Sequence, residues 1–118
     1  MKERIQRVNE LFKQEIAKII LREIDLPSDI LITVTEVETS VDLQHTKVLI
    51  SVLPEDKTKT TVSFLNKHIY EIQQMINKKL NMRPVPRIVF REDYQIAKEG
   101  RIEELLQEAK RNKKELED

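Results

Sequence analysis

The apolar residues between residues 57 and 91 recur in alternating steps of three and four, and this spacing constrains the fold more than any other feature. They are Val62, Leu65, Ile69, Ile72, Ile76 and Leu80. Such spacing puts all these side chains on one face of an amphipathic helix. Because no glycine interrupts it, the pattern predicts one long helix from about Thr58 to Leu80, straight or gently bent. A breaker run with two prolines follows at 81–86, and Arg87 to Arg91 is short and strand-like.

Similar patterns predict the other elements. Apolar residues three or four apart predict a helix from Lys2 to about Ile24, which ends before Pro27. Residues 30–37 and 46–53 are rich in Ile, Val and Thr, and they predict two strands. A last helix is indicated by the spacing of a further apolar group, Ile102, Leu105, Leu106 and Ala109.

The element order is therefore helix, strand, strand, helix, strand, helix, without a repeat. Three strands with helices packed on one face make a two-layer α+β domain, which we place at residues 1–109. Residues 110–118 are almost wholly charged, and we expect this tail to be disordered. The first strand changes phase, because Ile32 and Val34 share a face with Glu36 while Val37 lies opposite. A β-bulge near Thr35 would return Val37 to the core and turn Glu36 and Glu38 outward.

Charge is strongly divided along a chain whose formal net charge is zero. Residues 1–22 carry six bases and three acids, and residues 23–56 carry Lys47 against eight acids. Residues 57–91 carry eight bases against Glu71, a net charge of +7, and residues 92–118 carry six bases against nine acids. Because local field rather than net charge attracts a polyanion, the basic stretches point to an anionic partner.

No arrangement of residues typical of catalysis is found in the sequence. The chain has no cysteine and only one glycine, which excludes thiolate zinc sites, disulfides and glycine-rich phosphate loops. His45 and His68 are far apart in the sequence and lack the spacing of metal ligands. Glu36 and Glu38 could resemble an acid/base pair, but their place on a solvated sheet face explains them. We expect no enzyme activity, cofactor or metal. No apolar run approaches the roughly 20 residues of a membrane span, so a cytoplasmic, soluble protein is expected.

The basic residues are therefore the candidate binding site, with a plain solvated helix face as the alternative. Arginine adds a planar fork to its charge, so it is the more telling phosphate ligand. Arg87 and Arg91 alternate with Ile88 and Phe90, and we expect both on the sheet face opposite the core. Aromatic residues are scarce, which favours recognition of structured RNA through its backbone and shape. The candidate RNA-binding residues are Arg4, Arg7, Lys18, Lys67, Lys78, Lys79, Arg83, Arg87 and Arg91.

Several short motifs follow one another along nearly the whole chain. In order they are Arg4-x-x-Arg7-Val8, Val34-Thr35-x-Val37-x-x-Ser40-x-Asp42-Leu43, Val48-x-Ile50-Ser51, Leu80-x-x-Arg83-x-x-Pro86-x-Ile88-x-Phe90-x-x-Asp93 and Gly100-Arg101-Ile102-x-x-Leu105-Leu106. Each motif is short, but their order resembles that of the bacterial ribosome-binding factor A family.

The resemblance implies a fold like a type II KH domain and a role as an assembly factor for the small ribosomal subunit. Such a factor binds small-subunit ribosomal RNA near the decoding region and neck, supports late maturation, matters in the cold and leaves before translation. No cofactor, membrane or small-molecule substrate is implied, and we expect a monomer.

In that family an Ala-x-Gly kink interrupts the long helix. Counting back from Pro86 without gaps places this triplet at His68-Ile69-Tyr70, which has neither the alanine nor the glycine. We therefore expect an unbroken helix here, with Lys67 and Tyr70 presenting a surface different from the family's.

Two other functions are consistent with the same charges. One is a protein-interaction adaptor that docks an acidic partner through its basic helix faces. The other is an RNA-binding module outside ribosome assembly, although an ordinary KH domain would need a glycine-rich loop.

Overall fold

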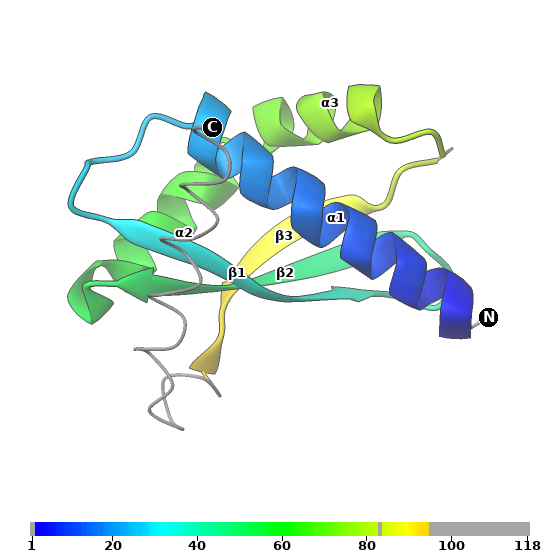
Figure 1. The fold of residues 1–118 in the computed structure, drawn as a ribbon, viewed down its shortest axis with the longest axis horizontal. Coiled ribbons are helices and arrows are strands. Elements are labelled where there is room, and N and C mark those ends of the chain that lie inside the picture. Colours follow the sequence, from blue (N-terminus) through cyan, green and yellow to red (C-terminus); the bar gives the residue numbers. More distant parts are fainter. Residues whose placement is uncertain (1, 83, 95–118) are drawn as a thin grey trace.

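The computed structural model describes residues 2–82 and 84–94 and begins with a long helix, α1 (Lys2–Glu23) (Figure 1). Its apolar side chains Phe12, Ile16 and Ile19 are fully buried, as their spacing predicts. The predicted end of this helix near Ile24 is confirmed to within a residue. Pro27 lies in the loop that leads from α1 to the first strand.

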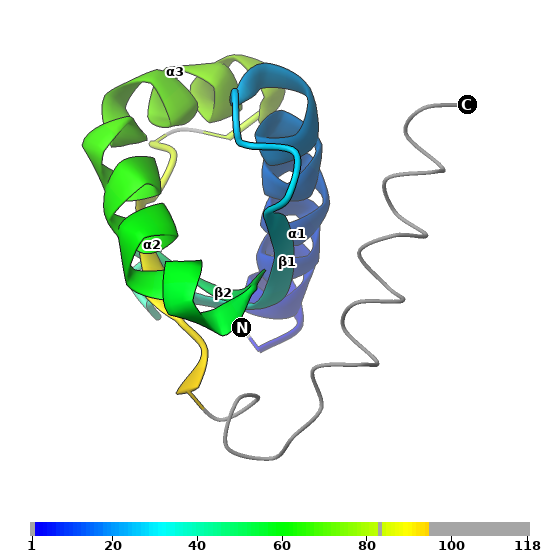
Figure 2. The same ribbon diagram turned by 90° about the vertical axis from the view of Figure 1, so that its left-hand side faces the viewer.

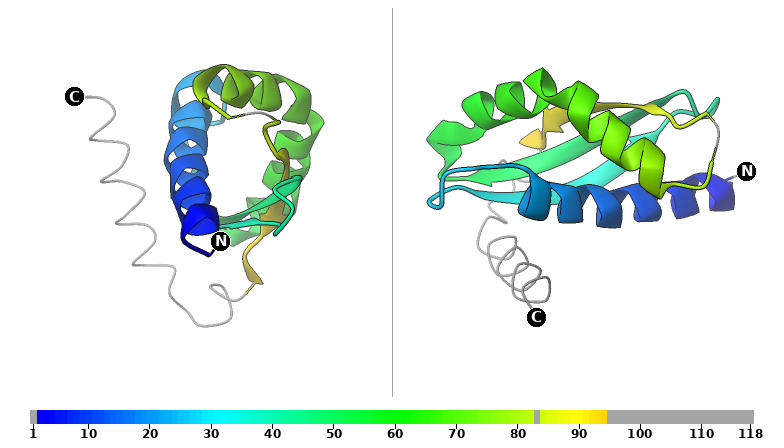
Figure 3. Two further views of the ribbon diagram at one scale, coloured as in Figure 1. Left: turned by 90° about the vertical axis from the view of Figure 1, so that its right-hand side faces the viewer. Right: turned by 90° about the horizontal axis from the view of Figure 1, so that it is seen from above.

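A mixed three-stranded sheet carries the helices on one face. Its strands are β1 (Leu31–Thr39), β2 (His45–Leu53) and β3 (Arg87–Glu92), in the order β1-β2-β3. β1 and β2 are antiparallel, whereas β2 and β3 are parallel and therefore need a long crossover connection. Figure 2 shows α1, α2 and α3 around the concave inner face of the sheet, and Figure 3 shows the same arrangement from the opposite end. The predicted two-layer α+β fold is confirmed.

The predicted bulge in β1 is present. Val34 pairs with Ile50 but Glu36 pairs with Leu49, so Thr35 is the extra residue. Val37 is consequently buried, and Glu36 and Glu38 are exposed. The single proton of the Thr35 hydroxyl is shared between Asp93 Oδ2 at 2.6 Å and the Leu49 carbonyl at 3.1 Å. The bulge thus aims a polar side chain at the end of β3.

The predicted single long helix is wrong. After a short 3-10 turn, Glu55–Lys57, the chain forms α2 (Thr58–Lys67) and α3 (Ile69–Lys79), separated by His68. His68 has φ −99° and ψ 19°, a conformation open to any residue, so the break needs no glycine. Its N–H is shared between the carbonyls of Phe64 and Leu65, both at 3.2 Å. The break lies where the family resemblance places a kink.

The bend allows the two helices to contact different partners. α2 packs against β3 and β2, while α3 packs against α1 and β3. Leu65, Ile72 and Ile76 are all fully buried, so the period of three and four is continued across the break. They join Val48, Ile50 and Phe90 of the inner sheet face in one core. A straight helix could not follow the curvature of the twisted sheet in this way.

Two side-chain amides, Asn66 of α2 and Gln73 of α3, cover the outer edge of β3. Asn66 donates to the Phe90 carbonyl at 3.0 Å and accepts from the Phe90 N–H at 2.9 Å. Gln73 donates to the Pro86 carbonyl at 3.0 Å and accepts from the Ile88 N–H at 2.9 Å. We call this pair the amide clamp. It gives β3 the hydrogen bonds that a fourth strand would supply, which protects the edge from other chains.

The predicted last helix and the predicted charged tail lie outside the described residues. The domain boundary at residue 109 therefore stays a prediction. Within the described ranges, no helix is long and apolar enough to cross a membrane.

Candidate nucleic-acid interface

One end of the molecule gathers three segments that are distant in sequence: the first turns of α1, the turn between β1 and β2, and the start of β3 (Figure 1). The Thr39 hydroxyl bonds to Asn9 Oδ1 and so ties α1 to the end of β1. The Arg87 N–H donates to the Gln44 carbonyl at 2.9 Å, and Arg87 pairs in register with His45. These contacts fix the positions of the first turns of α1, which carry Arg4 and Arg7, and of the start of β3, which carries Arg87.

The turn between β1 and β2 is built by Ser40 and Asp42. The Ser40 hydroxyl donates to Asp42 Oδ1 at 2.6 Å, and the Gln44 N–H donates to the same carboxyl oxygen at 3.1 Å. These two bonds, the Ser40 bond foremost, lower the pKa of Asp42 below its ordinary value. Leu43 has a φ of 60°, a left-handed conformation that the turn imposes on a non-glycine residue. The Ser40-x-Asp42-Leu43 motif is therefore explained by turn formation.

Arg4 and Arg7 lie three residues apart on the exposed surface of α1, at this end of the molecule. Glu3 and Glu10 lie close to Arg7 on the same helix and reduce the local positive field. Both arginines are exposed, as a contact with RNA would require. The flanking glutamates make this a mixed rather than a purely basic surface.

Lys18 and Lys79 meet at a single carboxylate. Glu15 Oε1 lies 3.7 Å from Lys18 Nζ on the same helix, and Glu15 Oε2 lies 3.8 Å from Lys79 Nζ at the end of α3. The Glu15 side chain is only 19% exposed, so the three groups join α1 to α3. Their combined charge is +1 rather than +2, which leaves a weaker anion site than the sequence suggests. The neighbouring Lys78 is exposed.

Arg87 and Arg91 are exposed on the outer sheet face, and Ile88 and Phe90 between them are buried, as predicted. The two arginines stand about 13 Å apart, because strand residues rise about 3.3 Å each. Arg91 lies closer to Lys67 of α2 than Arg87 does, because the residues that precede them in the sequence, Phe90 and Asn66, are hydrogen-bonded to each other. Arg83 lies outside the described residues.

The structure thus divides the candidates into two groups. Arg4, Arg7 and Arg87 share the end described above, with Lys78 and Lys79 at the nearby end of α3 and Lys18 joined to Lys79 through Glu15. Lys67 and Arg91 stand farther along the sheet. Both groups are on surfaces that a phosphate backbone could reach, and no single pocket among the described residues unites them.

The features that sequence reasoning missed are polar residues in structural roles. They are Asn66 and Gln73 of the amide clamp, Asp93 beneath the bulge, and Glu15 between two lysines. His68 is half-buried at the helix break, where its ring packs against Phe64 at a tilt of 49° with centroids 4.5 Å apart, and its Nδ1 lies 3.5 Å from Glu71 Oε2. The available signal was a polar residue at helical spacing from core positions: Gln73 lies four residues after Ile69 and three before Ile76.

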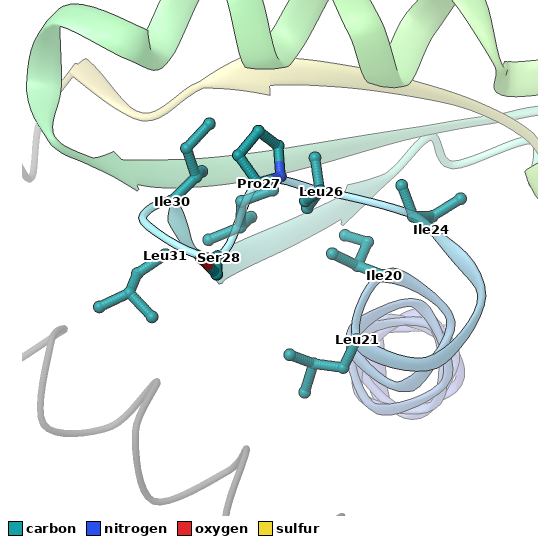
Figure 4. Close-up of a pocket in the computed structure, with 9 residues that line it drawn as sticks. Ile20, Leu21, Ile24, Leu26, Pro27, Ser28, Ile30 and Leu31 are labelled. Atoms are coloured by element: carbon teal, nitrogen blue, oxygen red, sulfur yellow. The ribbon is translucent and has the colours of Figure 1, made fainter.

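A small cavity lies between the end of α1 and the start of β1, with a volume of about 120 Å³ (Figure 4). Apart from Ser28 its lining is aliphatic or proline: Ile20, Leu21, Ile24, Leu26, Pro27, Ile30, Leu31 and Ile32. This lining offers neither an acid nor a base to activate the Ser28 hydroxyl. In the described part of the chain, no group of His, Cys, Asp or Glu residues could hold a metal ion.

The architecture defines the class of protein. It is a two-layer KH-like α+β domain whose cations are spread over exposed helix and strand surfaces. The family model described as Ribosome-binding factor A matches residues 4–106. The chain is also 40% identical over 110 residues to the ribosome-binding factor A of Halothermothrix orenii, covering 92% of this chain and 90% of that one. The chain belongs to the ribosome-binding factor A family.

Solved structures agree on the fold. The crystal structure of ribosome-binding factor A from Thermus thermophilus superposes with a TM-score of 0.65 at 20% identity, covering 75% of this chain and 94% of that one. A homology model of the Thermus thermophilus factor, fitted into a cryo-EM map of its complex with 30S, gives a TM-score of 0.59 at 20% identity. That alignment covers 70% of this chain and 88% of the other.

Proposed function

We propose that this protein binds the small ribosomal subunit through its ribosomal RNA and supports late maturation of that subunit. It acts without catalysis or a cofactor, as a cytoplasmic monomer. The observation that carries the proposal is the family match over residues 4–106. The complex of the Thermus thermophilus relative with 30S supports the choice of partner.

The charge distribution supports an RNA partner. Arg4, Arg7 and Arg87 stand exposed at one end, beside the turn that Ser40 and Asp42 build. A rigid set of cations on separate elements suits the backbone of folded RNA, whose phosphates are fixed in space. The two tyrosines among the described residues, Tyr70 and Tyr94, are both exposed and do not form a base-stacking platform with a second aromatic ring.

The experiment that tests this proposal compares immature and mature small-subunit particles. The purified protein is expected to bind immature particles more tightly, with an affinity that falls steeply as salt rises, because phosphate contacts release counterions. Sedimentation of the protein with each particle across a salt series measures both properties. Equal or absent binding to the two particles would contradict the proposal. Retention by one protein partner after nuclease treatment would instead support an adaptor.

Arg87→Ala is expected to weaken RNA binding and to flatten its salt dependence. Loss of one phosphate contact lowers the slope of log affinity against log salt by about 0.7 to 0.9. Arg22→Ala is the matched control, because Arg22 is also exposed but lies in the last turn of α1, at the opposite end. If both variants keep the wild-type slope, Arg87 is not at the interface.

A further inference from the structure

The outer face of the sheet carries a row of aliphatic side chains that we call the outer strip: Leu31, Leu49, Leu53 and Val89. Each alternates with residues of the inner face, such as Val48, Ile50 and Val52 of β2, which are buried. Leu31 pairs in register with Leu53, and Leu49 pairs with Arg91. The outer strip therefore runs diagonally from the start of β1 across β2 to β3.

The outer strip is separate from the core. None of its members belongs to the buried core or to the half-buried residues packed against it, within the part of the chain that the structure describes. The helices of the described ranges lie on the inner face (Figures 2 and 3). At its β1 end the strip meets the small cavity, which Leu31 also lines, and Leu21 of α1 is 39% exposed beside it (Figure 4). The lining of this cavity thus connects Leu21 of α1 with Leu31 of the sheet.

Asp93 forms a latch that fixes the end of β3 to the two other strands. The Asp93 N–H donates to the Ile50 carbonyl at 2.9 Å, which continues the parallel pairing of β3 with β2. Asp93 Oδ2 accepts from the Thr35 hydroxyl at 2.6 Å, on the far side of β2. Asp93 therefore reaches across the sheet to β1 and is itself only 8% exposed. Tyr94, the last described residue, is 70% exposed next to this latch.

The sequence after the latch matches such a surface. Residues 99–109 place Ile102, Leu105, Leu106 and Ala109 on one helical face, with acids on the others. The eight residue-to-residue steps from Tyr94 to Ile102 can span up to about 26 to 29 Å, close to the length of a nine-residue strand. We propose that residues 99–109 of this chain dock their apolar face on the outer strip, with Leu21 and Leu31 at one end of the contact.

Charge favours this occupant. Residues 99–109 carry Glu99, Glu103, Glu104 and Glu108 against Arg101. The outer sheet face carries the exposed arginines Arg87 and Arg91 on its β3 side, and the exposed acids Glu36 and Glu38 on its β1 side. Acidic side chains on the flanks of the docked segment would meet these arginines at the rim of the contact. The proposal does not rest on ribosome or RNA binding, since both partners belong to the same chain.

Spin labelling tests the docking directly, because the full chain has no cysteine to interfere. Gln107→Cys introduces one label on the polar side of the segment and leaves its apolar face intact. We expect the amide resonances of Leu31, Leu49 and Leu53 to lose most of their intensity, while those of Tyr70 and Val62 keep theirs. In the same labelled chain, Leu105→Asp with Leu106→Asp should restore the lost intensities.

Two controls make the result decisive. Leu116→Asp in the labelled chain is a similar substitution beyond the segment and should leave the intensity losses unchanged. Mixing a labelled chain with an isotope-enriched unlabelled chain should produce no loss, which excludes a second copy as the occupant. Absence of any loss on the outer strip, losses centred on another surface, or losses in the mixed sample would each overturn the proposal. Unfolding midpoints confirm that the compared variants are folded.

Discussion

Replacing Asn66 and Gln73 together by leucine is expected to lower the free energy of unfolding by about 2 to 6 kcal/mol, at about 1 to 3 kcal/mol for each side chain. Leucine keeps much of the volume of either amide but offers no hydrogen bond. The substitutions leave the N–H groups of Ile88 and Phe90 and the carbonyls of Pro86 and Phe90 without their partners. Urea denaturation followed by circular dichroism measures the change.

The matched control is Gln74→Leu with Asn81→Leu. These residues have the same chemistry and are exposed on α3 and just beyond it. Their substitution should change the free energy of unfolding by no more than about 0.5 kcal/mol. A clamp variant that matches this control would show that water replaces the two amides at no cost.

Ile72→Ala is expected to lower the free energy of unfolding by about 2 to 5 kcal/mol, because it removes a fully buried side chain and leaves a cavity. The loss should be the same at low and high salt, since no charge is involved. Denaturation at two salt concentrations checks both statements. Tyr70→Ala is the control, because Tyr70 is 74% exposed on the same helix and should contribute little.

At a temperature where Ile72→Ala is folded, its affinity for RNA and the salt slope of that affinity are expected to equal those of the wild type. Weaker RNA binding by the folded variant would show that this core residue affects the interface. This result would separate packing from the charged surface, which Arg87→Ala probes without touching the core.

Much of the fold could be predicted from periodicity. The helical spacing located α1 and the combined stretch of α2 and α3, and the dense β-branched residues located β1 and β2. The phase change in β1 predicted the bulge, because only an extra residue could bury Val37 with Val34. Strand order was not predictable, since the parallel pairing of β2 with β3 depends on how the intervening helices pack.

The break at His68 shows where local propensity misleads. The residue types around His68 predicted a continuous helix, because neither glycine nor proline is present. A single residue with negative φ nevertheless suffices to end one helix and begin another. The gap-free count from Pro86 had placed the family kink at this triplet. Tertiary packing on a twisted sheet decided the outcome, so the resemblance located the break and intrinsic propensity did not.

The candidate interface was predictable only in part. Alternation correctly placed Arg87 and Arg91 outside the core, and helical spacing placed Arg4 and Arg7 on the surface. The contact of Lys79 with Glu15 joins residues 64 positions apart and carries no local signal. Assignment of these residues to RNA contacts stays a prediction.

The amide clamp also has a consequence for how copies of this protein could exchange segments. β3 occupies a slot with main-chain groups of β2 on one side and two side-chain amides on the other. If β3 left its slot, a β3 from a second copy could restore every one of those hydrogen bonds, because an identical strand has the same register. The same groups that stop edge growth therefore define the place where domain swapping would occur.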